Sequence, residues 1–119
     1  MGPKKADEPE VTRKFKGLYQ NMGMWRARIW SEGGEVYLGH YDSQEAAGGA
    51  YDRAAVRLRG LDEAIKDGLN NPAKWMALKT DSADVAVQQD LDAMLSMQWP
   101  ECLEYIRKDA NKIKDRTIP

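Results

Sequence analysis

Residues 35–60, with the sequence EVYLGHYDSQEAAGGAYDRAAVRLRG, constrain the fold more than any other stretch of the chain. Residues 35–41 alternate as a strand does, and a polar turn at Asp42 and Ser43 leads into a helix over 43–59. Asp42, followed three residues later by Glu45, has the pattern of an N-terminal capping box, and Gly60 stands where a helix commonly ends. The sequence therefore predicts a strand, a tight turn and a helix in direct succession.

The predicted helix is unusually rich in small side chains, and two of them are glycines that each cost about 1 kcal/mol relative to alanine. These residues are Ala46, Ala47, Gly48, Gly49, Ala50, Ala54 and Ala55. Small side chains allow a helix to lie very close to a flat surface. We therefore expect the helix to pack on a sheet through Ala47, Ala50 and Ala54.

Two further strands are expected before this stretch. Residues 14–19 form the first, in which Gly17 indicates a bulge or a close backbone approach. A short connection leads to the second strand over 24–31, and a glycine turn leads to the third over 35–41. The predicted fold is therefore α+β: a three-stranded antiparallel sheet packed on one helix, with a helical C-terminal extension.

The period-2 rule divides the sheet residues between two faces. The face toward the helix is expected to hold Trp25, Ala27, Ile29, Val36 and Leu38. The opposite face is expected to hold Arg26, Arg28, Trp30, Glu35, Tyr37 and Tyr41. One helix covers one face, so the second face, which we call the open face, is where a partner would bind.

Composition narrows the class of protein. The chain has 119 residues, 42% of them hydrophobic, and contains no apolar run near the roughly 20 residues of a membrane span. One cysteine and one histidine, Cys102 and His40, are too few for a Cys/His zinc site, and no catalytic motif is present. We therefore expect no enzymatic activity, metal, cofactor, small-molecule ligand or membrane contact, with His40 in no ligand role and Cys102 a small buried side chain.

Charge is distributed unevenly although the net charge is −1. Residues 11–60 hold eight Lys and Arg against five Asp and Glu, whereas residues 61–119 hold eight against eleven. We divide the chain into a tail over 1–12, a domain over 13–72 and an acidic helical extension over 73–119. The difference in charge suggests that the last two have different roles.

The C-terminal region shows helical patterns. Short helices are expected at 61–66 and 73–79, then one capped by Asp81 or Ser82 that runs to Met97, and a last one from Pro100. The apolar side of the helix that ends at Met97 comprises Val85, Leu91, Met94 and Leu95. We expect four apolar side chains to be buried, either on the domain, on a second copy of the chain or on another protein. They are Leu91, Leu95, Leu103 and Ile106.

Two segments resemble a known family in the right order. YLGHYDSQEAAGGAYDRAAVRLRG and FKGLYQNMGMWRARIW are similar to the two halves of the Apetala-two/ethylene-response-factor DNA-binding domain. The segment Leu69–Pro72 resembles the Asn-Phe-Pro that closes that domain, so the resemblance covers residues 14–72.

The resemblance implies a nuclear, transcription-factor-type protein whose open sheet face enters the major groove of double-stranded DNA and binds it sequence-selectively. Carried over by position, the family's contacts fall on Lys16, Tyr19 and Asn21 in the first strand, Arg28 and Trp30 in the second, and Glu35 and Tyr37 in the third. The helix tyrosine that reaches a phosphate in the family falls on Tyr51. Alternation adds Arg26, and arginine suits the task because it pairs with guanine and neutralises phosphate.

Two other functions are compatible with the same residues. The fold could serve as a protein-interaction module that has lost DNA binding, since the family's third-strand arginine position holds Glu35. Alternatively, Tyr19, Trp30 and Tyr37 could stack the bases of RNA. Structural roles are also open: Trp30 and Tyr37 could pack on the C-terminal helices, and Tyr51 could be a buried helix–sheet aromatic.

Overall fold

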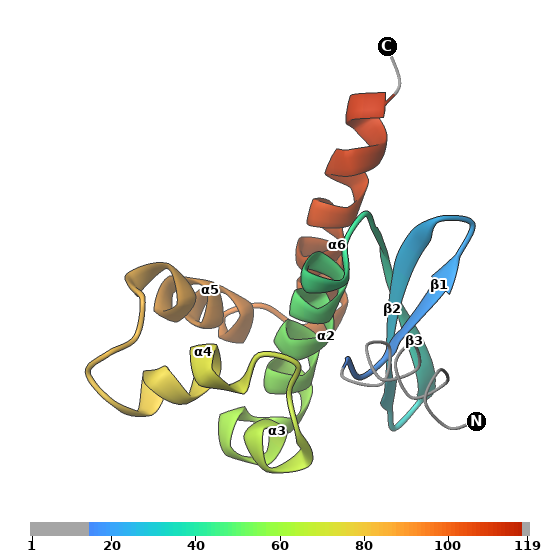
Figure 1. Cartoon of the computed structure of the whole chain (residues 1–119). Coiled ribbons are helices and arrows are strands. Elements are labelled where there is room, and N and C mark those ends of the chain that lie inside the picture. Colours follow the sequence, from blue (N-terminus) through green and yellow to red (C-terminus); the bar gives the residue numbers. More distant parts are fainter. Residues whose placement is uncertain (1–14, 118–119) are drawn as a thin grey trace, which may run out of the picture.

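The computed structural model describes residues 15–117 as a three-stranded sheet with helices packed on one side of it (Figure 1). The predicted α+β fold is confirmed. The strands are β1 (Leu18–Asn21), β2 (Met24–Ser31) and β3 (Gly34–Tyr41), antiparallel in the order β1-β2-β3. The helices are α2 (Gln44–Arg59), α3 (Leu61–Asp67), α4 (Pro72–Met76) with a 3-10 turn over Ala77–Lys79, α5 (Val85–Leu95) and α6 (Trp99–Thr117). The predicted tail over 1–12 lies outside the described residues.

The first strand begins later than predicted because of Gly17. This residue has a positive φ of 74°, which interrupts the extended backbone, although its carbonyl still accepts a hydrogen bond from Arg28 N at 2.9 Å. A Cβ atom at Gly17 would lie 2.2 Å from the ring of Tyr51, so the helix approaches the backbone closely there, as the glycine suggested. β1 therefore covers Leu18–Asn21 rather than 14–19.

The two predicted helix caps are each displaced along the chain. Ser43, not Asp42, is the N-cap of α2, since its backbone is extended and its side chain accepts from Ala46 N at 3.1 Å. Asp84, not Asp81 or Ser82, caps α5 by accepting from Ala86 N at 3.0 Å. In both cases the residue nearest the first helical turn has the geometry to cap it.

Helix α2 contacts the sheet and also α3, α5 and α6, while α6 in addition contacts β3 (Figure 1). Ala47, Ala50 and Ala54 are all buried, as expected for a helix that packs closely on a sheet. Ala27, Ile29 and Leu38 form the buried part of the opposing sheet face, and Trp25 and Val36 are half-buried beside them. The small side chains of α2 thus place its axis near the strands.

The extension packs on α2 rather than on the open face of the sheet. Arg53 of α2 binds both carboxylate oxygens of Asp90 in α5 at 2.9 Å, and Tyr105 of α6 donates to the same carboxylate at 2.9 Å. Arg57 donates to the carbonyls of Met94 and Met97 at the C-terminal end of α5, at 3.0 and 2.7 Å. Two arginines of α2 therefore hold both long helices of the extension.

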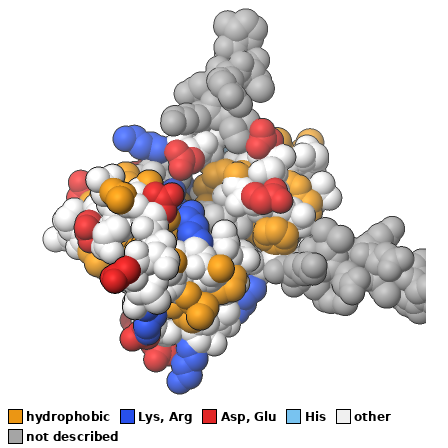
Figure 2. All heavy atoms as spheres, turned by 60° about the vertical axis from the view of Figure 1, so that its left-hand side comes forward, with side chains coloured by type: hydrophobic (Ala, Val, Ile, Leu, Met, Phe, Trp, Pro, Cys, Tyr) orange, Lys and Arg blue, Asp and Glu red, His pale blue; other side chains and the backbone are white. Residues whose placement is uncertain are grey.

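The buried residues of the extension differ partly from the expected set. Met94, Cys102 and Ile106 are fully buried and Leu91 is nearly so, but Leu103 is only half-buried. Val85 and Leu95, predicted on the apolar side of α5, are 67% and 59% exposed. The reason is helical periodicity: Val87, Leu91 and Met94 are four and three residues apart and share the buried side of α5, whereas Val85 lies on its other side. The helical side of the molecule shows acidic and basic side chains interspersed with hydrophobic ones (Figure 2).

The edge of the sheet at β3 is covered by α6. Arg107 donates to the carbonyl of Tyr37 from Nε at 3.1 Å and from Nη2 at 2.6 Å. Ala110, one turn further along α6, lies where a Cβ atom at Gly39 would approach to 2.8 Å. These contacts satisfy an edge carbonyl and protect the strand from pairing with other chains. Within residues 15–117 no helix is long and apolar enough to cross a bilayer.

Candidate nucleic-acid interface

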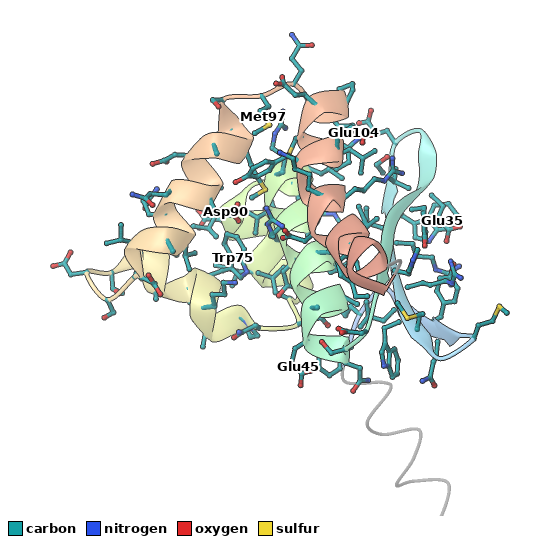
Figure 3. The ribbon with its side chains drawn as sticks, turned by 90° about the horizontal axis from the view of Figure 1, so that it is seen from above. Glu35, Glu45, Trp75, Asp90, Met97 and Glu104 are labelled. Atoms are coloured by element: carbon teal, nitrogen blue, oxygen red, sulfur yellow. The ribbon has the colours of Figure 1, made fainter. Side chains whose placement is uncertain are left out.

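The open face holds a row of large polar and aromatic side chains that none of the described helices covers. Trp30 is 66% exposed and Tyr37 is 37% exposed, so neither side chain is buried under the C-terminal helices. In a view from above, Glu35 lies on the side of the sheet away from the helices, whereas Trp75 and Asp90 lie among the helices (Figure 3). The face is therefore accessible to a large partner.

Arg28 occupies the middle of this face, where it contacts both neighbouring strands. Its guanidinium lies 4.7 Å from the centre of the Tyr19 ring in β1, and its Nη1 lies 2.9 Å from Oε2 of Glu35 in β3. Both members of the ion pair are partly exposed. A planar cation held between an aromatic ring and a carboxylate has few accessible rotamers, so Arg28 is pre-organised.

Arg26 is held in a second network beside the first. Its Nη1 donates to the hydroxyl of Tyr37 at 3.0 Å, and that hydroxyl lies 3.2 Å from Nδ1 of His40. The Nε atom of Arg26 is enclosed and finds no acceptor among the described residues. The two arginines thus present their remaining donors from fixed positions on one surface.

A β-bulge determines which residues line this face. Opposite Ala27 and Arg28 the register of β3 shifts by one residue, so that Arg28 faces Tyr37 while Ala27 faces Gly39, which has a φ of 113°. Beyond the bulge the alternation is inverted. Tyr41, predicted on the open face, is therefore buried on the helix side, and His40 takes the position beside Arg26. Gly39 inside the strand was the signal for this in the sequence.

The other predicted contact residues lie elsewhere. Lys16 donates from Nζ to the carbonyl of Asp67 at 2.7 Å, at the C-terminal end of α3 rather than on the open face. Tyr51 is buried against Gly17, and its hydroxyl accepts from Arg59 Nη1 at 3.3 Å. Asn21 ends β1 opposite Met24. The structure therefore brings together Tyr19, Arg26, Arg28, Trp30, Glu35 and Tyr37, and it separates Lys16 and Tyr51 from them.

Behind the open face, Asp52 connects separate segments of the fold, a role that the sequence did not reveal. This fully buried carboxylate accepts from the backbone N–H groups of Asn70 and Asn71 at 2.7 and 2.8 Å. Burial raises the pKa of Asp52 above its ordinary value, while the two backbone hydrogen bonds act in the opposite direction. Asn70 in turn donates to the carbonyls of Lys16 and Gly48 at 3.2 and 3.3 Å and accepts from Lys16 N. Asp52 and Asn70 thereby connect three parts of the chain: the residues just before β1, helix α2, and the residues just before α4.

The described residues also lack a side-chain group of the kind that binds metal ions. Among residues 15–117 no group of three or more His, Cys, Asp or Glu side chains could hold a metal ion. Cys102 is buried, as expected for a small apolar side chain, and burial raises the pKa of its thiol. The open face therefore offers hydrogen-bond donors, aromatic rings and one carboxylate.

Comparison with known proteins gives relatives of one kind. The chain is 31% identical to the AP2-like ethylene-responsive transcription factor TOE2 of Arabidopsis thaliana over 82% of its length, and 45% identical to APETALA2-like protein 2 of Oryza sativa subsp. indica over 49%. It is 38% identical over 88% of its length to an AP2/ERF and B3 domain-containing transcription factor of Arabidopsis thaliana. No family model matches the chain. AP2/ERF abbreviates the Apetala-two/ethylene-response-factor family.

The chain carries an AP2/ERF-type domain. It spans 18%, 14% and 30% of the length of these three relatives. Two of the alignments cover 82% and 88% of the chain, which is more than residues 1–72 could supply, so they include part of the extension. The likeness therefore continues beyond the AP2/ERF-type domain into the helices that pack on α2.

Proposed function

We propose that this chain binds double-stranded DNA sequence-selectively, through insertion of the open sheet face into the major groove. The observation that carries the proposal is the pair of pre-organised arginines, Arg26 and Arg28, on a face that the extension leaves exposed. A β-ribbon is narrow enough to enter the major groove, and arginine is the side chain that most often recognises guanine there. Trp30 and Tyr37 flank the arginines and can contact thymine methyl groups or sugars.

The relatives support the same biological role. The names of two of them describe transcription factors, and a domain that recognises a DNA sequence is the part such a protein needs in order to select a gene. We propose that the chain belongs to a nuclear protein that regulates transcription. In this proposal the extension supports the AP2/ERF-type domain through α2 and presents α5 and α6 to a protein partner or a second copy.

Charge predicts how strongly the binding should depend on salt. Residues 11–60 carry an excess of three positive charges, and Glu35 on the open face neutralises part of the charge of Arg28. Few phosphates can therefore be neutralised, and the slope of log K against log salt should be shallow, about −2 to −5. Affinity should depend more on base contacts than on the phosphate backbone.

The experiment is a selection from random duplexes, followed by a salt titration of binding to the selected duplex. Arg28→Ala should weaken binding to that duplex by about 5- to 150-fold, the equivalent of 1–3 kcal/mol, and abolish preference at one position. Lys66→Ala in α3 is the matched control, because it removes one exposed positive charge away from the open face and should leave the preferred sequence unchanged. Lys16→Ala should leave the preferred sequence unchanged, because Nζ of Lys16 donates to the carbonyl of Asp67 away from the open face.

The same binding assay can contradict the proposed function. If the wild type binds no duplex more tightly than random DNA even at low salt, the chain is not a sequence-selective DNA-binding domain. Preferential binding of single-stranded RNA in the same assay would assign the aromatic residues a stacking role instead. Absence of both activities would favour the protein-interaction module.

A further inference from the structure

The pairing of Arg28 with Glu35 carries an inference that rests on the proposed function and specifies it. A carboxylate on a DNA-binding face is unfavourable near phosphates, so Glu35 needs a reason to stand beside Arg28 on the open face. Ion pairs between partly exposed side chains contribute little to stability, so fold stability does not supply that reason. Hydrogen bonding to the base edges of the major groove offers such a reason.

The contact between the two side chains leaves hydrogen-bonding capacity on both. It joins Nη1 of Arg28 to Oε2 of Glu35, and within residues 15–117 neither side chain makes a further hydrogen bond. A guanidinium has five N–H donors in a planar fork, and a carboxylate oxygen accepts more than one hydrogen bond. A donor group and an acceptor group are therefore presented side by side, with their contacting atoms 2.9 Å apart.

One base pair has the complementary arrangement in the major groove. Guanine offers the acceptors N7 and O6, and the cytosine paired with it offers the N4 amino donor next to O6. Arginine can donate to both guanine acceptors while the adjacent carboxylate accepts from the cytosine amino group. When the same base pair is inverted, the carboxylate faces guanine acceptors and the guanidinium faces the amino donor, which is repulsive on both sides.

We propose that Arg28 and Glu35 act as a unit that recognises a single G·C base pair in one orientation, with Arg28 on guanine and Glu35 on cytosine. Tyr19 positions the unit by holding the guanidinium against its ring. Glu35 is then a specificity-determining residue whose function is to exclude the inverted pair. Because Glu35 also repels phosphate, it should lower affinity for all DNA while it raises discrimination.

The test uses the duplex selected by the whole chain and the base pair whose preference disappears in Arg28→Ala. Binding is measured to that duplex and to a copy in which the single G·C pair is inverted to C·G. Glu35→Ala should reduce the ratio of the two affinities by about fivefold or more, equivalent to about 1 kcal/mol. Glu35→Gln, which keeps an acceptor oxygen but no charge, should retain part of the ratio.

Glu32→Gln provides the matched control, because Glu32 is an exposed carboxylate in the turn between β2 and β3 and lies outside the ion pair. It should change the salt dependence slightly and leave the ratio as in the wild type. Thermal melting of each variant checks that the fold is intact. If both Glu35 variants bind all duplexes more tightly by the same factor and keep the ratio, Glu35 acts through charge alone and the inference is wrong. Failure of the wild type to select any duplex would instead overturn the proposed function, and the inference with it.

Discussion

Gly39 shows how one residue decides the composition of a binding face. Its positive φ and the bulge beside it invert the alternation of β3, which buries Tyr41 and places the half-buried His40 beside Arg26. A side chain at Gly39 would be strained by the backbone and would meet Ala110 of α6. The bulge therefore links the open face to the extension through a single close contact.

Tyr41 provides a prediction at the residue scale. Burial raises its pKa from 10.0 to about 12, and its hydroxyl donates to the carbonyl of Leu38 at 3.0 Å. Tyr41 ionises near pH 10.0 in the unfolded chain and near pH 12 in the folded chain. Its contribution to stability is therefore fully present below pH 10.0 and is lost as the pH rises toward 12. Urea titrations at pH 9 to 11 should show the free energy of unfolding falling less steeply in Tyr41→Phe than in the wild type. Equal slopes for the two proteins would contradict a tyrosine buried in its neutral form.

Helix α2 is the element on which both layers depend, since it contacts the sheet on one side and the extension on the other. Its two glycines have different surroundings. A Cβ atom at Gly48 would lie 2.9 Å from the ring of Phe15, whereas a Cβ atom at Gly49 would meet nothing within 4 Å. Close packing thus explains Gly48 but not Gly49.

Ala50→Leu tests that close packing at the scale of the element. Ala50 is buried on α2, so the larger side chain should overpack the core and lower the free energy of unfolding by about 1–3 kcal/mol. Gly49→Ala is the control on the same helix, and it should raise stability by up to about 1 kcal/mol, because its Cβ has room and alanine favours helix. Chemical denaturation of both variants gives the two values. A leucine variant as stable as the parent would disprove the close-packed helix.

At the scale of the whole molecule, the extension forms part of the hydrophobic core. Met94, Cys102 and Ile106 belong to the same buried cluster as Ala27 and Leu38 of the sheet. Polar contacts from Arg53 and Arg57 hold α5 and α6 in place against α2. The extension is therefore expected to fold together with the sheet and α2 in one cooperative transition.

Removal of residues 73–119 should lower the free energy of unfolding of the remaining chain. The loss should exceed the cost of truncating a single buried Met or Ile, which is about 2–5 kcal/mol. Ile106→Ala tests the same packing without truncation and should cost about 2–5 kcal/mol, because Ile106 is fully buried. Leu95→Ala is the control, since Leu95 is largely exposed and should change stability by less than about 0.5 kcal/mol. Melting temperature and mass in solution are the measurements. An unchanged melting temperature after truncation would show the extension to be an independent appendage.

The sequence by itself determined the order and type of the elements, because the alternation in β2, the glycine turn before β3 and the small residues of α2 are local patterns. It also determined that Arg26, Arg28 and Trp30 share a face, since β2 is regular from end to end. Three features were decided by tertiary structure. The bulge at Gly39 moved Tyr41 and His40, the contact with Asp67 drew Lys16 away from the open face, and the packing of one side of α5 on the core left Val85 and Leu95 exposed. The bulge depends on how β3 pairs with β2, and the other two features depend on contacts between segments far apart in the chain. Local periodicity carries no information about which surface will cover a side chain.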